Sequence, residues 1–473
     1  MRQRDKVKEK GRKRRKKRSN PSPNQNRVVL NYRSVKTTPP KKVCSSPVMK
    51  AGSINGVFPC EMLERVFCLL APSDLRSVVL VCRRWREVGE APHLWAHQGL
   101  TLTERNLAGV EEVLTTRRLA GLQSLTLKTI SQDLFHYLHG LTSIRNLDMS
   151  KVKLTYLENG LLPLLQSLPR LERLALKGCG LSHLQATQVC QVLREGGGLR
   201  SLDLSVNNLG EVEPALMAEV VGRAREARLV KTCLSNLQVS TLLMYLGEDT
   251  YLTSLDLSHN SLYFVDPALL ARAALYLKNL TLWGTDLTYH HLEELCITLK
   301  DEARLRSLDL TGIKVTMLDP SLLAGGVNRL EKARLVRTGL SYDQATALCS
   351  GITDCMTLRS LDLSFNNLSS VRSCLLARAM VCLEEVSLWG AWLTPLQAIA
   401  LCGALGEHTP LRRLDLSNND LSEVNPEVLV RTVTYLERVS LMWACLTTGQ
   451  ATALCSALPS CSRCCSSCSF YTS

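Results

Sequence analysis

The sequence predicts an α/β protein, a solenoid with a curved parallel sheet on the inside and helices on the outside. Two observations carry this prediction. Leucines recur in the pattern L-x-x-L-x-L-x-x-N-x-L, which is typical of strand-plus-helix repeats, and its clearest copy begins at Leu358. The pattern also has a fixed period, because such openings stand at positions 199, 252, 305, 358 and 411, each 53 residues after the last.

The period contains two alternating units. A looser version opens at positions 224, 277, 330, 383 and 436, so units of 25 and 28 residues alternate. Less regular openings at 122, 144 and 171 bring the total to 13. Strands pack about 4.8 Å apart whereas helices are about 10 Å wide, so stacked units must curve with their strands on the inside.

Capping signals mark where the helices begin. Second units carry a serine or threonine followed three residues later by glutamine, which is a capping-box spacing. These boxes begin at Ser182, Ser341, Thr394 and Thr447. First units instead carry an acidic residue or asparagine before a proline, which suits the first helical position. These prolines are Pro214, Pro267, Pro320 and Pro426. We therefore expect a helix after each strand.

Positive charge is concentrated at the N-terminus. The chain has 473 residues and a net charge of +14, and residues 1–50 hold 18 basic residues against two acidic ones, which is +16. The remaining 39 basic and 41 acidic residues leave −2. Residues 1–52 are predicted to be a disordered tail, because they are rich in Lys, Arg, Ser, Pro and Asn and lack apolar periodicity. With no apolar run long enough for a membrane span and no signal core, an intracellular protein is expected.

The densest basic run is a candidate nuclear-localisation signal, which predicts a protein of nucleus and cytoplasm. It consists of Arg12, Lys13, Arg14, Arg15, Lys16, Lys17 and Arg18. Contact with nucleic acid is the less favoured interpretation, and it predicts an affinity that falls steeply with salt. A merely solvated tail is the third.

Several of the 19 cysteines follow the repeat. Cys296, Cys349, Cys402 and Cys455 stand 53 residues apart, and Cys190 occupies the same place two repeats before the first of them, with a leucine in the repeat between. A position shared by cysteine and leucine is interpreted as a small buried hydrophobe rather than a metal or disulfide site. This interpretation favours a reducing compartment.

Residues 57–95 predict a small helical module. Apolar residues fall at helical spacing over positions 62–70, Pro72 interrupts them, and the Ser-Asp pair that follows can cap a second helix. A third segment covers positions 84–88. Three short helices are too few for a self-sufficient core, so much of the apolar surface of this module needs a partner.

The module resembles the F-box. The motifs that carry the resemblance are Phe58-Pro59, Glu61, Met62-Leu63, Pro72-Ser73-Asp74-Leu75, Val81-Cys82-Arg83-Arg84-Trp85 and Leu94-Trp95. F-boxes dock on the Skp-type adaptor of cullin ubiquitin ligases, so the resemblance implies this adaptor, and through it a cullin, as partners. By analogy the apolar docking face would consist of Pro59, Leu63, Val66, Leu70, Leu75 and Val79. A helical cap on the solenoid is the alternative.

The repeats are similar to leucine-rich arrays of the ribonuclease-inhibitor kind, in which two unit types alternate. Together the two resemblances imply an F-box and leucine-rich-repeat protein. The expected organisation is a basic tail at 1–52, an F-box at 53–97, a linker at 98–121, a solenoid at 122–460 and a Cys/Ser-rich tail at 461–473.

Residues beside the strand leucines are predicted to face the concave side, because strand side chains alternate. Candidate substrate-binding residues there are Asp256, Asp309 and Asp362, together with Trp283 and Trp389. The rows of acids either attract a basic, partly aromatic partner or hydrogen-bond with backbone and hydroxyl groups inside the repeat. Tryptophan is enriched at binding hot spots.

No catalytic residue, metal or cofactor is predicted. His290, His291, Glu293 and Glu294 cluster on a predicted helix, but their spacing matches no zinc-hydrolase signature, and they are interpreted as a solvated helix face. The final cysteines, Cys461, Cys464, Cys465 and Cys468, lack the loop that usually separates zinc-ligand pairs. An alternative or truncated end to a longer array is favoured there over metal binding or lipidation.

The leading functional hypothesis is a substrate-recognition subunit of a Skp–cullin–F-box ubiquitin ligase. In it the F-box docks the adaptor and the repeats bind a protein to be ubiquitinated. The alternative is a non-catalytic scaffold or inhibitor that binds a partner without ubiquitin transfer.

Overall fold

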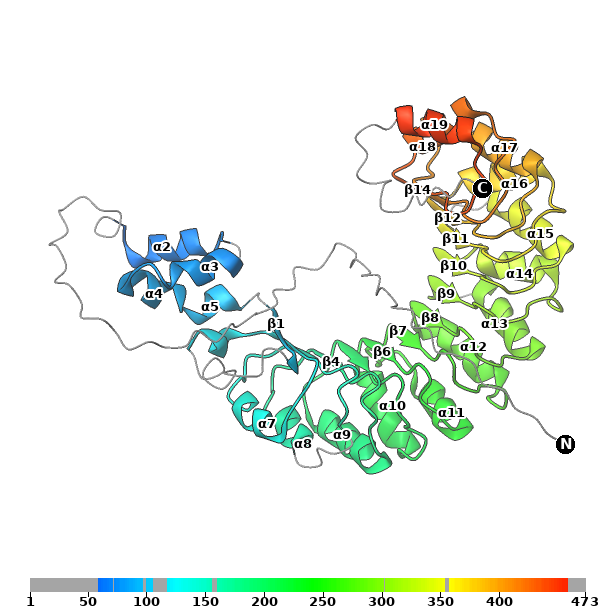
Figure 1. The fold of residues 1–473 in the computed structure, drawn as a ribbon. Coiled ribbons are helices and arrows are strands. Elements are labelled where there is room, and N and C mark those ends of the chain that lie inside the picture. The colour runs from blue at the N-terminus through cyan, green and yellow to red at the C-terminus, as the bar shows by residue number, and fades with distance from the viewer. Residues whose placement is uncertain are drawn as a thin grey trace, which may run out of the picture.

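The computed structural model describes residues 58–70, 72–96, 99–104, 117–154, 160–301, 303–353 and 357–457. They form a curved array with a small helical module at its N-terminal end (Figure 1). The basic run at 12–18 and the cysteines after position 460 lie outside the described residues. No described helix is long and apolar enough to cross a membrane.

The inner face of the array is a parallel sheet, as predicted. Its 14 strands pair in chain order. They are β1 (Gly99–Leu102), β2 (Ser124–Leu127), β3 (Asn146–Asp148), β4 (Arg173–Ala175), β5 (Ser201–Asp203), β6 (Glu226–Arg228), β7 (Ser254–Asp256), β8 (Asn279–Thr281), β9 (Ser307–Asp309), β10 (Lys332–Arg334), β11 (Ser360–Asp362), β12 (Glu385–Ser387), β13 (Arg413–Asp415) and β14 (Arg438–Ser440). The middle residue of most strands is buried and its two neighbours are more exposed, as in β7. This alternation places those two neighbours on the concave side.

Helices line the outer side of the curve (Figure 1). They are η2 (Arg117–Gly121), α7 (Gln132–Leu138), α8 (Leu161–Gln166), α9 (His183–Glu195), α10 (Pro214–Arg223), α11 (Asn236–Tyr245), α12 (Pro267–Tyr276), α13 (Tyr289–Asp301), α14 (Pro320–Val327), α15 (Tyr342–Thr353), α16 (Ser373–Val381), α17 (Pro395–Ala404), α18 (Pro426–Tyr435) and α19 (Thr448–Ala457). The predicted caps are confirmed. Ser182 and Thr394 begin complete capping boxes, and Pro267 is among the prolines at the first helical turn.

The array begins one strand earlier than predicted. Residues 98–121, expected to be a linker, contain β1, which pairs with β2 in register, Leu100 opposite Leu125. Leu100 and Leu102 are both buried in the core of the array. Two alternating leucines are too short a pattern to identify a strand from sequence, so the structure corrects this part of the domain organisation.

Cysteines fill the core position that the register predicts. Cys190, Cys296, Cys349 and Cys402 are fully buried, and the described cysteines form no disulfide. Burial raises the pKa of the Cys349 thiol to about 12, so the thiol stays protonated and behaves as a small hydrophobe. Cys455 differs because it is exposed on α19, the last helix described.

Buried asparagines fasten neighbouring units to one another. The amide nitrogen of Asn366 donates to the carbonyl oxygens of Leu335 (2.6 Å) and Leu363 (3.0 Å). Its amide oxygen accepts from the backbone N–H groups of Thr338 and Gly339. Asn207, Asn260 and Asn419 make equivalent bonds. One buried side chain thus satisfies backbone groups that the turn after a strand leaves without a partner.

A second fastening comes from the capping boxes. The side-chain amide of Gln344 donates to the Val315 and Leu318 carbonyl oxygens of the preceding unit. In α13 His291 occupies the position equivalent to Gln344. This side chain is buried, so the prediction that the histidine and glutamate cluster forms a solvated helix face is wrong for His291. Its Nδ1 accepts from the Thr288 N–H and its Nε2 lies 2.8 Å from the Val265 carbonyl oxygen. The histidine therefore makes the contact with the preceding unit that Gln344 makes in its own repeat.

The N-terminal module consists of α2 (Cys60–Phe67), α3 (Pro72–Val78), α4 (Arg83–Gly89) and the single turn α5 (Pro92–Trp95). Three helices were predicted, and α5 is the addition. It lies against η2 of the array. Gly121, at the end of η2, leaves no room for a side chain, because a Cβ there would lie 2.2 Å from the Pro92 carbonyl oxygen. The module and the array are therefore joined by a close backbone contact.

We predict that His291→Gln is tolerated or raises the urea-unfolding midpoint of the chain, because glutamine makes two bonds where this ring nitrogen makes one. His291→Ala is expected to cost about 1–3 kcal/mol, since it leaves buried polar groups unpaired. Exposed His290→Gln is the matched control and should be neutral. A loss of stability in His291→Gln equal to that in His291→Ala would contradict this role.

We predict that Gly121→Ala loosens the joint between module and array. The added Cβ cannot fit beside Pro92, so α5 must move away from η2. Amide hydrogen exchange at residues 92–95 and 117–121 should accelerate at least about tenfold. The control is Gly197→Ala, where nothing lies within 4 Å of the added carbon. Unchanged exchange at the joint in Gly121→Ala would refute the close contact.

Candidate protein-binding surfaces

The N-terminal module has its own small core. Leu63, Phe67 and Leu75 are buried together with Trp95. The Trp95 indole N–H donates to the Gly89 carbonyl oxygen at 2.7 Å, and Phe67 meets the Trp85 ring edge-on with the centroids 5.3 Å apart. Both tryptophans thus hold the module together.

The structure divides the six predicted docking residues into two groups. Leu63, Leu75 and Val79 are only 4%, 2% and 7% exposed, because they pack inside the module. Side chains this deeply buried cannot contact a partner in this conformation. Pro59 is exposed, Val66 is 53% exposed and Leu70 is half-buried. Only this second group is available for docking.

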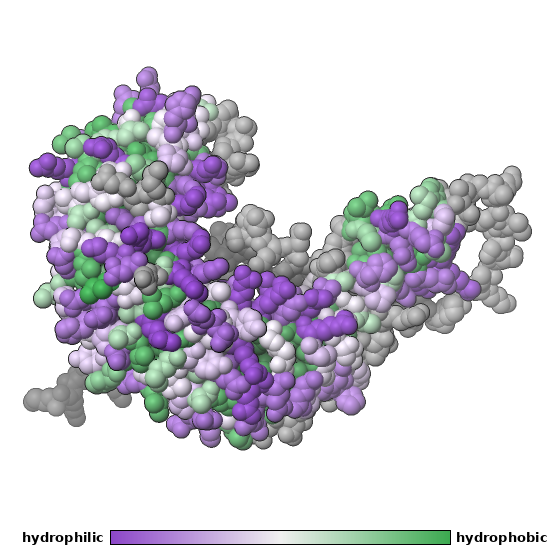
Figure 2. Space-filling model, turned by 180° about the vertical axis from the view of Figure 1, so that it is seen from behind, coloured by the Kyte–Doolittle hydropathy of each residue, from purple (hydrophilic) through white to green (hydrophobic). Residues whose placement is uncertain are grey.

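Other exposed apolar side chains extend the available face. Met62, Val66 and Leu69 follow one another at helical spacing along α2 and the turn after it, and they are 49%, 53% and 87% exposed. Leu80 and Val81, after α3, are also exposed. Figure 2 shows hydrophobic surface gathered on this module. Sequence reasoning missed Met62 and Leu69, although their spacing from Val66 was the signal that could have identified them.

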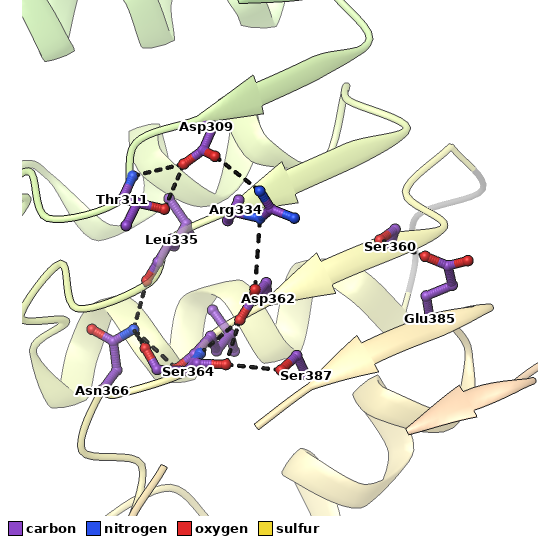
Figure 3. Close-up of polar contacts among 11 residues, drawn as sticks. Asp309, Thr311, Arg334, Leu335, Ser360, Asp362, Ser364, Asn366, Glu385 and Ser387 are labelled. Carbon is purple, nitrogen blue, oxygen red and sulfur yellow. Dashed lines mark hydrogen bonds and ion pairs between the residues drawn. The ribbon is translucent and has the colours of Figure 1, made fainter. Parts of the chain in front are cut away.

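The concave aspartates are engaged inside the repeat. Asp309 accepts from the Thr311 N–H at 2.9 Å, and Asp362 accepts from the Ser364 N–H at 3.1 Å. Arg334 lies between the two carboxylates, 3.2 Å from Asp309 and 3.6 Å from Asp362 (Figure 3).

Asp256 accepts from both the N–H and the hydroxyl of Ser258. Of the two interpretations that the sequence left open, hydrogen bonding within the repeat is the one observed. Whether Asp256, Asp309 or Asp362 also contacts a substrate stays a prediction.

Exposed charges at the strand starts are matched as well. Arginine and glutamate from neighbouring units pair there within 3.2 Å. The pairs are Arg145–Glu172, Arg306–Glu331, Arg359–Glu384 and Arg412–Glu437. Exposed pairs of this kind contribute only about 0–1 kcal/mol each. The exposed arginines and glutamates of these four pairs at the strand starts therefore compensate one another in charge.

Tryptophans stand at the ends of the strands. Trp283 and Trp389, the predicted contact residues, are 48% and 38% exposed in the turns after β8 and β12. Trp392 lies in the same turn as Trp389 and Trp443 lies in the turn after β14, and they are 73% and 56% exposed. All four tryptophans of the array are therefore partly exposed along one edge of the sheet, and sequence reasoning singled out only two. Large exposed aromatic side chains mark candidate interaction sites.

Metal-ligating side chains do not form a cluster in the described part of the chain. Within the described ranges, no group of three or more His, Cys, Asp or Glu side chains has the arrangement of a metal site. Of the histidine and glutamate cluster on α13, His291 is structural and Glu293 accepts from the Tyr289 hydroxyl at 2.7 Å. The surfaces described above suit protein binding.

Comparisons with known proteins agree with this arrangement. A model of the F-box-like family matches residues 58–101. Two leucine-rich-repeat models match residues 248–262 and 354–371, and residues 410–431. The F-box match coincides with the helical module and its continuation into β1.

Curated relatives match the repeats. NACHT, LRR and PYD domains-containing protein 12 of Homo sapiens is 28% identical over 284 residues, which is 56% of this chain and 27% of that protein. Ribonuclease inhibitor of Mus musculus is 27% identical over 267 residues, which is 53% of this chain and 58% of the inhibitor. The aligned regions thus span about a quarter to somewhat over half of these relatives.

Among solved structures, a leucine-rich-repeat protein of Leptospira interrogans is 18% identical with a TM-score of 0.42, covering 81% of this chain and 86% of that one. F-box and leucine-rich-repeat proteins are typically non-catalytic binding proteins. The chain carries an F-box-like domain followed by leucine-rich repeats similar to those of ribonuclease inhibitor and of NACHT, LRR and PYD domains-containing proteins.

Proposed function

We propose that this chain is the substrate-recognition subunit of a Skp–cullin–F-box ubiquitin ligase. The combination of an F-box with leucine-rich repeats is typical of such substrate adaptors. The observation that carries the proposal is an exposed apolar face on an F-box-like module that is joined by close contact to a curved array. A surface of this kind on a small domain is expected to be covered by a partner.

The division of labour follows from the architecture. The module docks the Skp-type adaptor through Met62, Val66 and Leu69, and the array holds the protein to be ubiquitinated. A conjugating enzyme elsewhere in the complex then transfers ubiquitin. This chain supplies proximity and orientation rather than a reactive group. The contact between Gly121 and Pro92 matters here, because a loose joint would not keep the substrate in reach of the enzyme.

A non-catalytic inhibitor is the second candidate, and the similarity of the repeats to ribonuclease inhibitor favours it. The two functions differ in the fate of the bound protein. A recognition subunit shortens the half-life of its partner, and proteasome inhibition restores it. An inhibitor leaves the half-life unchanged, so pulse-chase of proteins captured by the chain separates the two.

We predict that the triple substitution Met62→Gln, Val66→Gln, Leu69→Gln abolishes co-purification of the Skp-type adaptor. Each exposed side chain removed from an interface costs about 1 kcal/mol or more, so the combined loss in affinity is on the order of 100-fold. The module should stay folded, because none of the three belongs to its core. Circular dichroism and a pull-down with purified adaptor measure both properties.

The matched control replaces three exposed leucines on the outer helices, Leu184, Leu237 and Leu396, with glutamine. This variant should retain the adaptor. Substitution of Leu63 or Leu75 would be uninformative, since loss of a core side chain unfolds the module. Adaptor binding by the Met62, Val66, Leu69 variant at wild-type affinity would rule out this docking face.

We also propose that the basic run at 12–18, outside the described residues, directs the protein to the nucleus. Alanine substitution of Lys13, Arg14, Arg15 and Lys16 is predicted to shift a fluorescent fusion of the full chain from nucleus to cytoplasm. The control replaces Lys36, Lys41 and Lys42 in the same tail. Unchanged nuclear fluorescence would refute the signal. Salt-sensitive DNA binding that requires residues 1–50 would instead support nucleic-acid contact.

A further inference from the structure

Four large apolar side chains form an exposed row at the edge where α12, α13, α14 and α15 begin. They are Phe264, Tyr289, Met317 and Tyr342, one from each of four consecutive units. Met317 is 81% exposed and Phe264 is 76% exposed. A further exposed ring, Tyr263, meets Phe264 edge-on with the centroids 4.9 Å apart. We call the first four side chains the helix-start row.

The repeat does not require apolar residues at these positions. Phe264 and Met317 share one register position, which is Glu211 in the repeat before them and Ser370 in the repeat after. The two tyrosines share a second position, which is Asn236 in the repeat before them. The row is therefore confined to four units, and the folding of the repeat does not explain it. Exposed apolar patches of this kind mark interaction sites.

Contacts between units bring the four side chains into one row. The buried side chain two residues after each tyrosine bonds to the preceding unit. The Nε2 atom of His291 lies 2.8 Å from the carbonyl oxygen of the residue after Phe264, and Gln344 donates to carbonyl oxygens on both sides of Met317. Between these two pairs of units, α13 packs against α14. The row is thus continuous from α12 to α15 (Figure 1).

A carboxylate stands near each member of the row along the chain. The acids are Asp266, Glu293, Asp319 and Asp343, each within four residues of its apolar neighbour. Glu293 accepts from the Tyr289 hydroxyl at 2.7 Å. The hydrogen bond from the Ser321 hydroxyl lowers the pKa of Asp319, so this carboxyl is ionised at neutral pH. Among the described residues, only Glu293 of the four has an ion-pair partner, the exposed His290.

Nearby cations do not cancel this negative charge. The nearest Lys and Arg along the chain are Lys314 and Arg337, which are exposed at the strand ends. Asp286, in the turn before α13, and Glu294, in α13, add two exposed carboxylates to the four. Each helix N-terminus contributes about half a positive charge, so the six carboxylates exceed the two cations and the four helix ends together. An acid at a helix start also stabilises the helix, but this role does not account for the exposed apolar side chain beside it.

We propose that the helix-start row binds a basic segment of the substrate protein that carries large apolar side chains. The apolar side chains of the segment pack on the row, and its Lys and Arg side chains face the carboxylates beside the row. The sign of charge selects the occupant, since an acidic segment would meet these carboxylates with like charge. This inference rests on the proposed function, because it names the class of segment that the array recognises.

The spacing of the row sets the spacing of the segment. Packed helices lie about 8–10 Å apart, so successive members of the row are separated by about the same distance. A chain in the polyproline II conformation advances about 3.1 Å per residue and returns to the same side every three residues, which is about 9.3 Å. A segment with an apolar residue at every third position therefore presents one apolar side chain to each unit.

The test measures the fluorescence anisotropy of the fluorescein-labelled peptide GLKRFKRLKRFG as the full chain in complex with the Skp-type adaptor is added. In this peptide every third residue is apolar and the residues between are basic. We expect a Kd on the order of 10–100 µM that weakens as salt rises. GSKRSKRSKRSG, which lacks the apolar side chains, and GLDEFDELDEFG, with reversed charge, should bind at least about tenfold more weakly.

Variants of the chain locate the site. Met317→Ser and Tyr289→Asn introduce residues that stand at the same register positions in neighbouring repeats, so the array should stay folded by circular dichroism. Each should weaken GLKRFKRLKRFG at least about fivefold. Asp343→Lys should weaken GLKRFKRLKRFG and strengthen GLDEFDELDEFG, which a merely structural role of the aspartate would not produce. The controls are Leu396→Ser and Glu407→Lys, both at exposed positions, and both should leave binding unchanged.

Three results would overturn the proposal. They are absence of GLKRFKRLKRFG binding, equally tight binding of either control peptide, and insensitivity of binding to the Met317, Tyr289 and Asp343 variants. Binding that emerges only after deletion of residues 1–50 would assign the row to the basic tail of this chain and overturn its assignment to the substrate.

Retention of the adaptor is recorded for every sample. Failed peptide binding with the adaptor retained overturns the basic-segment proposal alone, whereas loss of the adaptor from the wild-type chain contradicts the proposed function. The titration is repeated with the chain alone to keep the two results independent.

Discussion

The fold depends on hydrogen bonds that fasten each repeat to its neighbour. Most strands contain only three residues, so the ladder between two strands is too short to hold the register by itself. Buried side chains add to it. Asn366 and Gln344 each reach backbone carbonyl oxygens of an adjoining unit, and His291 takes the place of the glutamine in one repeat. Each of these hydrogen bonds joins only neighbouring units. The stability of the array is therefore approximately a sum of contributions from single repeats and from contacts between adjacent repeats.

Curvature has a consequence for recognition. Narrow strands on the inside bring charged side chains of successive units close together, and the array compensates those charges internally. Arg334 lies between Asp309 and Asp362, and arginine–glutamate pairs occupy the strand starts. The edge where the strands end carries the exposed tryptophans of the array.

The helical module contacts the array through described residues. α5 packs on η2, and β1, the first described strand after the module, pairs with β2 of the sheet (Figure 1). Under the proposed function, the close contact between Gly121 and Pro92 helps to keep the adaptor-binding module in a constant relation to the substrate-binding array. The proposed ubiquitin transfer by proximity would need such a relation, because the chain itself would supply no reacting group.

The repeat, the parallel sheet, the helix caps and the buried cysteines could be predicted from the amino-acid sequence. These features follow from residue spacings within one unit or from the 53-residue period, so they can be predicted without knowledge of the tertiary contacts. Which groups face solvent became clear from the packing of the folded chain. Leu63 and Leu75 match the F-box motif yet are buried, His291 lies in the core, and β1 belongs to the sheet. Each of these outcomes depends on neighbours distant in the chain, and a helix of eight residues cannot reveal which of its apolar sides another helix will cover.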